Sequence, residues 1–270
     1  MQRLLTAAVL APLAWWLTKR GPDLAFAAAI VACVVLASRE AYAMLEARGM
    51  RPLRGLGLAL GAAVAASFAG PATELEPATA LGLAVAATFV AAMAIRPEPQ
   101  AMLDAALATI LPIVLIAFPM GFLAALRLID REMGPDLVLL LLLCVMLGDT
   151  AAYYTGRAFG KHRMAPSISP KKTWEGAAGA LFGSLVAAAL AHTWFFQRLT
   201  IVHAVALAVI LCVVGVLGDL AESMLKRASG VKDASSLLPG HGGLFDRIDS
   251  LLFAGPALYG YWRIFLEGRL

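Results

Sequence analysis

The stretch from Ile201 to Asp249 reads I-V-H-A-V-A-L-A-V-I-L-C-V-V-G-V-L-G-D-L-A-E-S-M-L-K-R-A-S-G-V-K-D-A-S-S-L-L-P-G-H-G-G-L-F-D-R-I-D, and it decides the fold. Its first part, Ile201 to Leu217, is an apolar run of the kind that crosses a bilayer as a helix. From Asp219 onward the chain is rich in charge, glycine and hydroxyl groups. Ionisable groups at a membrane edge are costly unless they are paired, hydrated or bound to a metal, so this cluster predicts a functional site.

The rest of the chain has the same apolar character. Of 270 residues, 61% are hydrophobic and 15% are charged, and the mean hydropathy is +0.80. This composition excludes an ordinary soluble domain and predicts an all-α polytopic membrane protein. We expect about nine transmembrane helices, at residues 4–18, 23–45, 53–70, 77–95, 101–125, 136–156, 174–196, 199–222 and 248–266.

We divide these helices into two regions. The N-terminal helices, 1–130, are expected to form a lipid cleft or an oligomer interface, and 131–270 is expected to be a catalytic membrane region with two motif loops. The run from Met1 to Leu17 is expected to remain as a first helix, because Thr18-Lys19-Arg20-Gly21-Pro22 follows it instead of a small-residue cleavage site.

The distribution of lysine and arginine predicts the orientation. Under the nine-helix interpretation, most basic residues fall in the loops after even-numbered helices, which places those loops in the cytoplasm. The two motif loops, 157–173 and 223–247, then lie on the same side. We therefore expect an integral protein of a bacterial-type inner (cell) membrane, with its active site facing the cytoplasm.

The later motif loop combines acidic and basic side chains. One helix face carries four polar residues at spacings of three, four and seven: Asp219, Glu222, Ser223 and Lys226. Asp246 and Asp249 share another face. Carboxylates are the ligands of a hard divalent cation, and basic groups bind phosphate, so together they indicate a site for a metal–nucleotide complex. The alternative is that the acids are helix caps and nothing more.

The earlier motif loop contains Ser169-Pro170-Lys171-Lys172-Thr173 before a helical run. Hydroxyl and ammonium groups at a helix N-terminus form a natural phosphate site. The alternative is a basic anchor for lipid headgroups. Asp149 lies late in the sixth expected span, where an acid seldom points at lipid, so we expect it to face the site or pair with a base.

These residues resemble the phosphatidate cytidylyltransferase family, the CDP-diacylglycerol synthases. The family hallmark S-x-x-K-R-x4-K-D-x-x-x-x-[LIF]-[PG]-x-H-G-G-x-x-D-R-x-D is matched at every fixed position by Ser223, Lys226, Arg227, Lys232, Asp233, Leu238, Pro239, His241, Gly242, Gly243, Asp246, Arg247 and Asp249. Three upstream segments also look like the family: Gly148 to Tyr153, Phe159 to His162 and Ser169 to Gly176. The resemblance covers the C-terminal half of the chain closely.

The resemblance implies that CTP and phosphatidate react to give CDP-diacylglycerol and pyrophosphate. With the clustered carboxylates, it leads us to assign Asp219 and Asp246 to Mg²⁺, with Asp249 and Glu222 as further ligands or orienting groups and room for a second cation. Basic side chains would share the phosphate charge, with Lys226 and Arg247 in the catalytic set. The expected substrate-binding residues are Asp149, Lys171, Lys172, Ser223, Arg227, Lys232, His241, Gly242 and Gly243.

Other functions remain open at the level of sequence. A transporter would also have many apolar helices, but it predicts ionisable residues at mid-membrane and paired broken helices, whereas here the charges gather at one rim. A CTP-dependent lipid kinase of the polyprenol or phytol type is the closer alternative. The expected partners are the two substrates and the lipid bilayer, with no nucleic acid, and a homodimer is implied by the resemblance alone.

Overall fold

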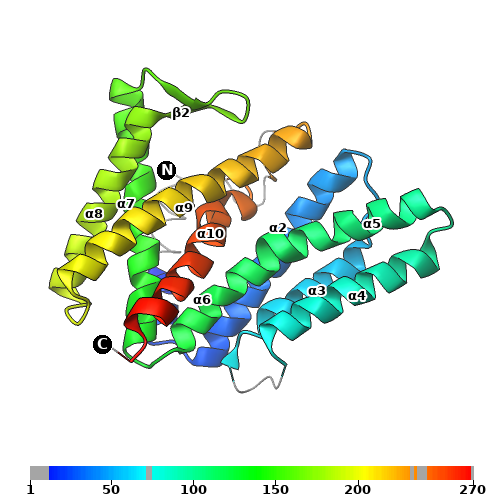
Figure 1. The fold of residues 1–270 in the computed structure, drawn as a ribbon, viewed down its shortest axis with the longest axis horizontal. Helices are drawn as coiled ribbons and strands as arrows, with labels where there is room; N and C mark the ends of the chain where they lie inside the picture. Colours follow the sequence, from blue (N-terminus) through cyan, green and yellow to red (C-terminus); the bar gives the residue numbers. More distant parts are fainter. Residues whose placement is uncertain (1–11, 71–74, 232–233, 236–241, 269–270) are drawn as a thin grey trace. The chain divides into compact units, whose positions relative to one another are not determined.

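The structure, a computed structural model, describes residues 12–70, 75–231, 234–235 and 242–268 (Figure 1). Helices dominate this part of the chain, and one short two-stranded sheet is present. The elements are α2 (Asp23–Ala47), α3 (Arg54–Ala66), α4 (Pro77–Ile95), α5 (Pro99–Pro112), the π-helix η2 (Ile113–Ala117), α6 (Phe118–Leu128), α7 (Met133–Phe159), β1 (Arg163–Ala165), β2 (Ser169–Thr173), α8 (Trp174–Trp194), α9 (Ile201–Ala228), α10 (Phe245–Tyr261) and the π-helix η3 (Trp262–Leu266). Residues 12–19 are also helical.

The described residues contain six helical segments that are long and apolar enough to cross a membrane. They are Asp23–Ala47, Pro77–Ile95, Pro99–Leu128, Met133–Phe159, Trp174–Trp194 and Ile201–Ala228. The prediction of an all-α polytopic membrane protein is therefore confirmed, whereas the count of nine spans is not. Helix α3 has 13 residues, α10 has 17 and continues into η3, and the expected first helix lies largely outside the described residues.

The chain divides into two compact units. Unit 1 consists of Met1–Leu128 and Lys226–Ile248, and unit 2 of Ile129–Leu225 and Asp249–Leu270. Helices α9 and α10 each contribute residues to both units. Each unit therefore receives one portion of the later motif, and the two portions are described separately below.

In unit 1, polar groups inside the bundle fix the packing of α2, α3 and α5. The hydroxyl of Tyr42 donates to the backbone carbonyl of Thr109 at 2.7 Å, and the hydroxyl of Thr109 accepts from the amide of Leu53 at 2.7 Å. Gly57 of α3 leaves the space that the Tyr42 hydroxyl occupies. A buried polar group is costly without a partner, so these paired groups favour one arrangement of the helices.

In unit 2, helices α7 and α8 pack backbone to backbone. A Cβ at Gly179 would overlap the side chain of Thr155, and a Cβ at Gly183 would overlap the carbonyl of Leu147. Small residues at such positions let helices approach closely in a membrane, where lipid tails are as apolar as side chains. The β1–β2 hairpin connects α7 to α8. In it, Arg163 pairs with Thr173 and Ala165 with Ser169.

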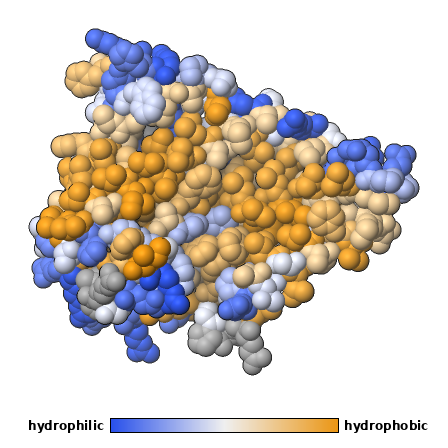
Figure 2. Space-filling model, in the orientation of Figure 1, coloured by the Kyte–Doolittle hydropathy of each residue, from blue (hydrophilic) through white to orange (hydrophobic). Residues whose placement is uncertain are grey.

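Hydrophobic side chains remain exposed along the helices, as expected for a protein that lies in lipid. On α9, Val202, Val205, Val209 and Val213 form one exposed stripe at helical spacing. Figure 2 shows apolar side chains along the helices, with hydrophilic side chains gathered near helix ends and connecting segments. This pattern agrees with an integral membrane protein.

Candidate functional site

Three carboxylates converge in unit 2. Asp219 and Glu222 come from α9 and Asp249 comes from α10, and one oxygen from each lies within 4.8 Å of the others. The side chain of Glu222 is buried, at 1% exposure, and the other two are partly buried. This is the group of acidic side chains in the described residues that has the geometry to share one cation.

Glycine at position 218 allows this convergence. A Cβ on Gly218 would lie 2.5 Å from the backbone carbonyl oxygen of Asp249 and 3.3 Å from the Cα atom of Ser250. Side chains cannot be accommodated at such distances, so α9 and α10 approach closely because residue 218 has none. The next residue in α9 is Asp219, whose carboxylate therefore reaches the Asp249 side chain.

A basic side chain from the earlier motif loop joins the carboxylates. The Lys172 ammonium lies 2.8 Å from Asp219 Oδ2 and donates to the carbonyl of Val216 at 3.4 Å. The Ser223 hydroxyl donates to Asp219 Oδ1 at 3.3 Å, and the Asp249 side chain accepts from the amide of Ser250 at 2.6 Å. Lys172 of the earlier motif loop and Ser223 of the later one thus both contact Asp219.

The hairpin positions Lys172. Strand β2 ends at Thr173, whose hydroxyl accepts from the Gly176 amide at 3.1 Å and caps α8. Glu175 lies in the first turn of α8, and its Oε1 atom is 2.7 Å from His162 Nδ1. The Thr173 hydroxyl therefore caps α8. Lys171, next to Lys172 in the chain, is exposed.

Asp149 lies near the same end of unit 2. Asp149 lines a cavity of about 10 Å³, which is also lined by Ser184, Cys212, Val216 and Ser250. A space of this size holds about one water molecule. Asp149 thus neighbours Ser250, which follows the carboxylate Asp249 in α10, and Val216, which receives Lys172.

In unit 1, Asp246 is engaged by three donors. Its Oδ1 atom lies 2.6 Å from the Lys226 ammonium, and its Oδ2 atom accepts from the amides of Gly243 at 2.8 Å and Ala234 at 3.1 Å. The side chains of Lys226 and Asp246 are 12% and 11% exposed. Asp246 thus links the end of α9, the motif loop and the start of α10. Its expected role as a magnesium ligand stays a prediction.

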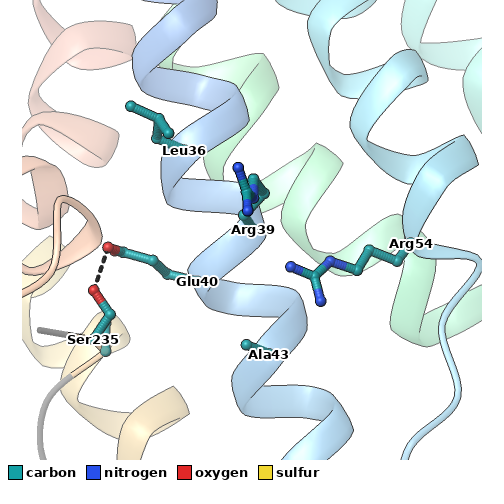
Figure 3. A pocket seen from close by; sticks show the side chains of 7 residues that line it. Leu36, Arg39, Glu40, Ala43, Arg54 and Ser235 are labelled. Atoms are coloured by element: carbon teal, nitrogen blue, oxygen red, sulfur yellow. Dashed lines mark hydrogen bonds between the residues drawn. The ribbon is translucent and has the colours of Figure 1, made fainter. Parts of the chain in front are cut away.

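An acidic residue outside the predicted set also contacts the motif. Glu40 of α2 is 6% exposed, and it accepts hydrogen bonds from Ser235, Leu244 and Phe245. Figure 3 shows the Glu40 side chain directed at Ser235, on the other side of α2 from Arg54. The available signal was an ionisable residue inside an expected apolar span, the same argument that selected Asp149.

The remaining predicted residues are more exposed or lie outside the described residues. Arg227 and Arg247 are exposed, and Arg227 donates to the carbonyl of Val231 at 3.3 Å. Gly242 has φ +78°, a left-handed conformation that favours glycine. Lys232 and His241 lie outside the described residues. The amide of Gly243 is bonded to Asp246, so its expected contact with a phosphate would require exchange of that bond.

The donor set suits a hard divalent cation. Asp219, Glu222 and Asp249 offer only oxygen atoms, which a hard cation with high charge density prefers. The Lys172 ammonium at 2.8 Å already balances part of their charge, which shows that this cluster stabilises a positive group. The residues present therefore fit a divalent cation.

The fold and the charged site define a polytopic membrane protein with acidic and basic side chains at the ends of its helices. Residues 1–265 match the model of the family described as the cytidylyltransferase family. The chain belongs to this family.

Several relatives carry the name phosphatidate cytidylyltransferase. The protein from Haemophilus influenzae is 44% identical over 141 residues, which cover 51% of this chain and 49% of the relative. The protein from Mycobacterium tuberculosis is 41% identical over 135 residues, covering 50% and 40%, and that from Staphylococcus saprophyticus is 43% identical over 128 residues, covering 47% and 49%. The matched segments thus span about half the length of these relatives or less.

Proposed function

We propose that this protein is a phosphatidate cytidylyltransferase, which converts CTP and phosphatidate to CDP-diacylglycerol and pyrophosphate. The observation that carries the proposal is the convergence of Asp219, Glu222 and Asp249 with Lys172 at 2.8 Å from Asp219. Carboxylates and an ammonium group in one place suit a metal-bound triphosphate. The family and the names of the relatives support the same reaction.

In this reaction a phosphate oxygen of phosphatidate attacks the α-phosphorus of CTP. The bond between that phosphorus and the oxygen bridging to the β-phosphate breaks, and pyrophosphate leaves with the electron pair. The lipid phosphate is largely ionised at neutral pH, so the protein needs neither a covalent nucleophile nor a strong base. Its contribution is to position the reactants and to neutralise charge.

We assign roles to the residues accordingly. Asp219, Glu222 and Asp249 would hold Mg²⁺, which when bound neutralises phosphate charge and polarises the α-phosphorus. Lys172 would contact a phosphate oxygen once its pairing with Asp219 is exchanged. In unit 1, Lys226 and Asp246 would hold the motif loop in place, and the exposed Arg247 would face the substrates' negative charge.

The setting of the reaction is also part of the proposal. The distribution of basic residues supports an active site on the cytoplasmic side of a bacterial-type inner membrane, where CTP is present. The lipid substrate would enter from the bilayer. A homodimer is proposed on the resemblance alone.

The experiment uses the full chain in detergent micelles with phosphatidate, Mg²⁺ and CTP labelled at either the α- or the γ-phosphate. Cytidylyl transfer moves the α-label into the lipid fraction and releases the γ-label as pyrophosphate, one for each lipid product. No lipid labelling from α-labelled CTP, in preparations that remain folded, would overturn the proposal.

The lipid kinase gives a different result in the same assay. With a polyprenol or phytol as acceptor, a kinase moves the γ-label into lipid and releases CDP. Transfer of the γ-label in place of the α-label would replace the proposed activity with that of a kinase.

A further inference from the structure

Glu40 lies in an unusual position for an acidic residue. It belongs to α2, a helix of 25 residues with a mostly apolar sequence, and only 6% of it is exposed. A buried carboxylate is costly unless several donors satisfy it. Glu40 Oε1 accepts from the Ser235 hydroxyl at 2.5 Å and from the Leu244 amide at 3.0 Å, and Oε2 accepts from the Phe245 amide at 2.8 Å (Figure 3).

Two of these donors are the amides at the start of α10. The first amides of a helix have no partner within the helix, and the helix dipole gives this end a partial positive charge. The Glu40 carboxylate supplies both the acceptors and the negative charge, from a residue about 200 positions earlier in the chain. It therefore caps the start of α10.

The same carboxylate explains the second glycine of the motif. A Cβ on Gly243 would lie 2.6 Å from Glu40 Oε2 and 3.0 Å from Ala234 Cβ, so a side chain at 243 would displace Glu40. Gly242 instead needs its left-handed φ of +78°. The two adjacent glycines thus have different structural causes, and one of them is the close approach of Glu40.

Asp246 holds the segment through a separate set of donors. It accepts from the amides of Gly243 and Ala234 and pairs with Lys226, whereas Glu40 accepts from Ser235, Leu244 and Phe245. The described residues of the motif loop are therefore fixed by two carboxylates, one in α10 and one in α2. The second of these ties the loop to the N-terminal helices.

The pocket beside Glu40 does not explain why a buried acid lies at this position. This pocket, of about 350 Å³, is also lined by Arg39 and Arg54 and would admit an anion. Arg54 is paired with Glu46 at 3.2 Å, and the Glu40 carboxylate is turned toward Ser235 and the start of α10. The contacts of Glu40 thus serve the motif loop.

We propose that Glu40 is a positioning residue for the nucleotide: it fixes Ser235, Leu244 and Phe245, and with them the start of α10, in the geometry that turnover of CTP requires. This inference rests on the proposed function. Displacement of positioning groups by about 1 Å can lower a rate about 100-fold, so loss of the Glu40 contacts has a large effect on turnover of CTP.

The test compares Glu40→Gln, Glu40→Asp and Ser235→Ala in the full chain, with Glu46→Gln as the control on the same helix. Glutamine has nearly the size of glutamate but lacks its charge and one acceptor oxygen. We expect Glu40→Gln to lower kcat/KM for CTP by about 10- to 100-fold, in part through a higher KM for CTP, with KM for phosphatidate within about twofold of wild type. Glu40→Asp should retain more of the wild-type kcat/KM for CTP than Glu40→Gln does. Ser235→Ala keeps both amide contacts of Glu40, so its kcat/KM for CTP should fall less than that of Glu40→Gln.

Two kinetic outcomes would overturn the proposal. One is wild-type kinetics in Glu40→Gln, and the other is an equal loss toward both substrates that follows the fall in thermal stability, as a purely structural role requires. If Glu40→Gln does not fold, Ser235→Ala decides the question through the same comparison of the two substrates.

Amide hydrogen exchange separates this inference from the proposed function. Glu40→Gln should speed exchange at Leu244 and Phe245 while exchange in α4 stays at the wild-type rate, and unchanged exchange at the two amides would overturn the positioning role. Absence of cytidylyl transfer by the wild-type protein, together with faster exchange in the variant, would overturn the proposed function and with it the link to CTP. The structural contact would then stand alone.

Discussion

Gly218 and Asp249 are in backbone contact: a Cβ at position 218 would lie 2.5 Å from the Asp249 carbonyl oxygen. This contact brings together the two helices that carry the acidic cluster. The side chains that would perform the chemistry therefore depend on a residue that has no side chain, and this dependence gives the first prediction.

Replacing Gly218 with valine should lower activity strongly. Valine would force α9 away from α10 and separate Asp219 from Asp249, and we expect kcat/KM to fall by about 100-fold or more, because a shift of about 1 Å suffices for that loss. Gly260→Ala is the matched control, since a Cβ at Gly260, also on α10, meets no atom within 4 Å. The measurement is pyrophosphate release, and normal turnover in Gly218→Val would refute the importance of the contact.

Removing one carboxylate should weaken metal dependence. Asp249→Asn keeps the shape of the side chain and removes its charge, so we expect turnover to fall about 100-fold and the Mg²⁺ concentration for half-maximal rate to rise. A titration with Mg²⁺ and with Mn²⁺ measures both effects. Asp104→Asn, in an exposed position on α5, controls for loss of negative charge. An unchanged metal titration in Asp249→Asn would exclude Asp249 from the set of metal ligands.

Lys172→Met should separate nucleotide binding from metal binding. The ammonium lies 2.8 Å from Asp219, so its loss removes a competing cation from the carboxylates and a partner from the phosphates. We expect KM for CTP to rise about tenfold, the effect of a lost charge-assisted contact, while the apparent affinity for Mg²⁺ does not fall. Lys161→Ala is the control for a lost exposed positive charge. A fall in Mg²⁺ affinity together with an unchanged KM for CTP would contradict this role.

The pair formed by Lys226 and Asp246 should be important for stability. Both side chains are largely buried, so Lys226→Met leaves a carboxylate without its cation, and the free energy of unfolding should fall by about 3 kcal/mol. Adding Asp246→Asn to this variant should restore part of the stability without restoring activity. Thermal unfolding of the two single variants and the double variant gives the coupling energy, and purely additive effects would argue against the pair.

Much of the fold could be predicted from hydropathy. The expected span 77–95 coincides with α4 (Pro77–Ile95), because proline starts this helix and Arg96-Pro97 follows it. Spacing along one helix also placed Asp219 and Glu222 together. These features depend on local sequence, which is why the sequence alone indicates them.

Contacts between distant segments could not be predicted in the same way. The hairpin at Arg163–Thr173 was not expected, because a short polar loop carries little periodicity. The pairing of Lys172 with Asp219 and the contacts of Glu40 with Leu244 and Phe245 arise from packing between helices that are far apart in sequence. Hydropathy sets which residues lie in the membrane, and it does not set which helices become neighbours.

The capping of α10 by Glu40 has a consequence for hybrid proteins assembled from two members of the family. A hybrid that takes its C-terminal half from one member inherits Gly243, which leaves space for the Glu40 carboxylate. The N-terminal half, from the other member, must then supply that carboxylate to cap α10. Exchange of the N-terminal helices should therefore be tolerated when the donor protein carries a carboxylate at the place of Glu40. It should fail when that place is apolar, even though every signature residue is retained.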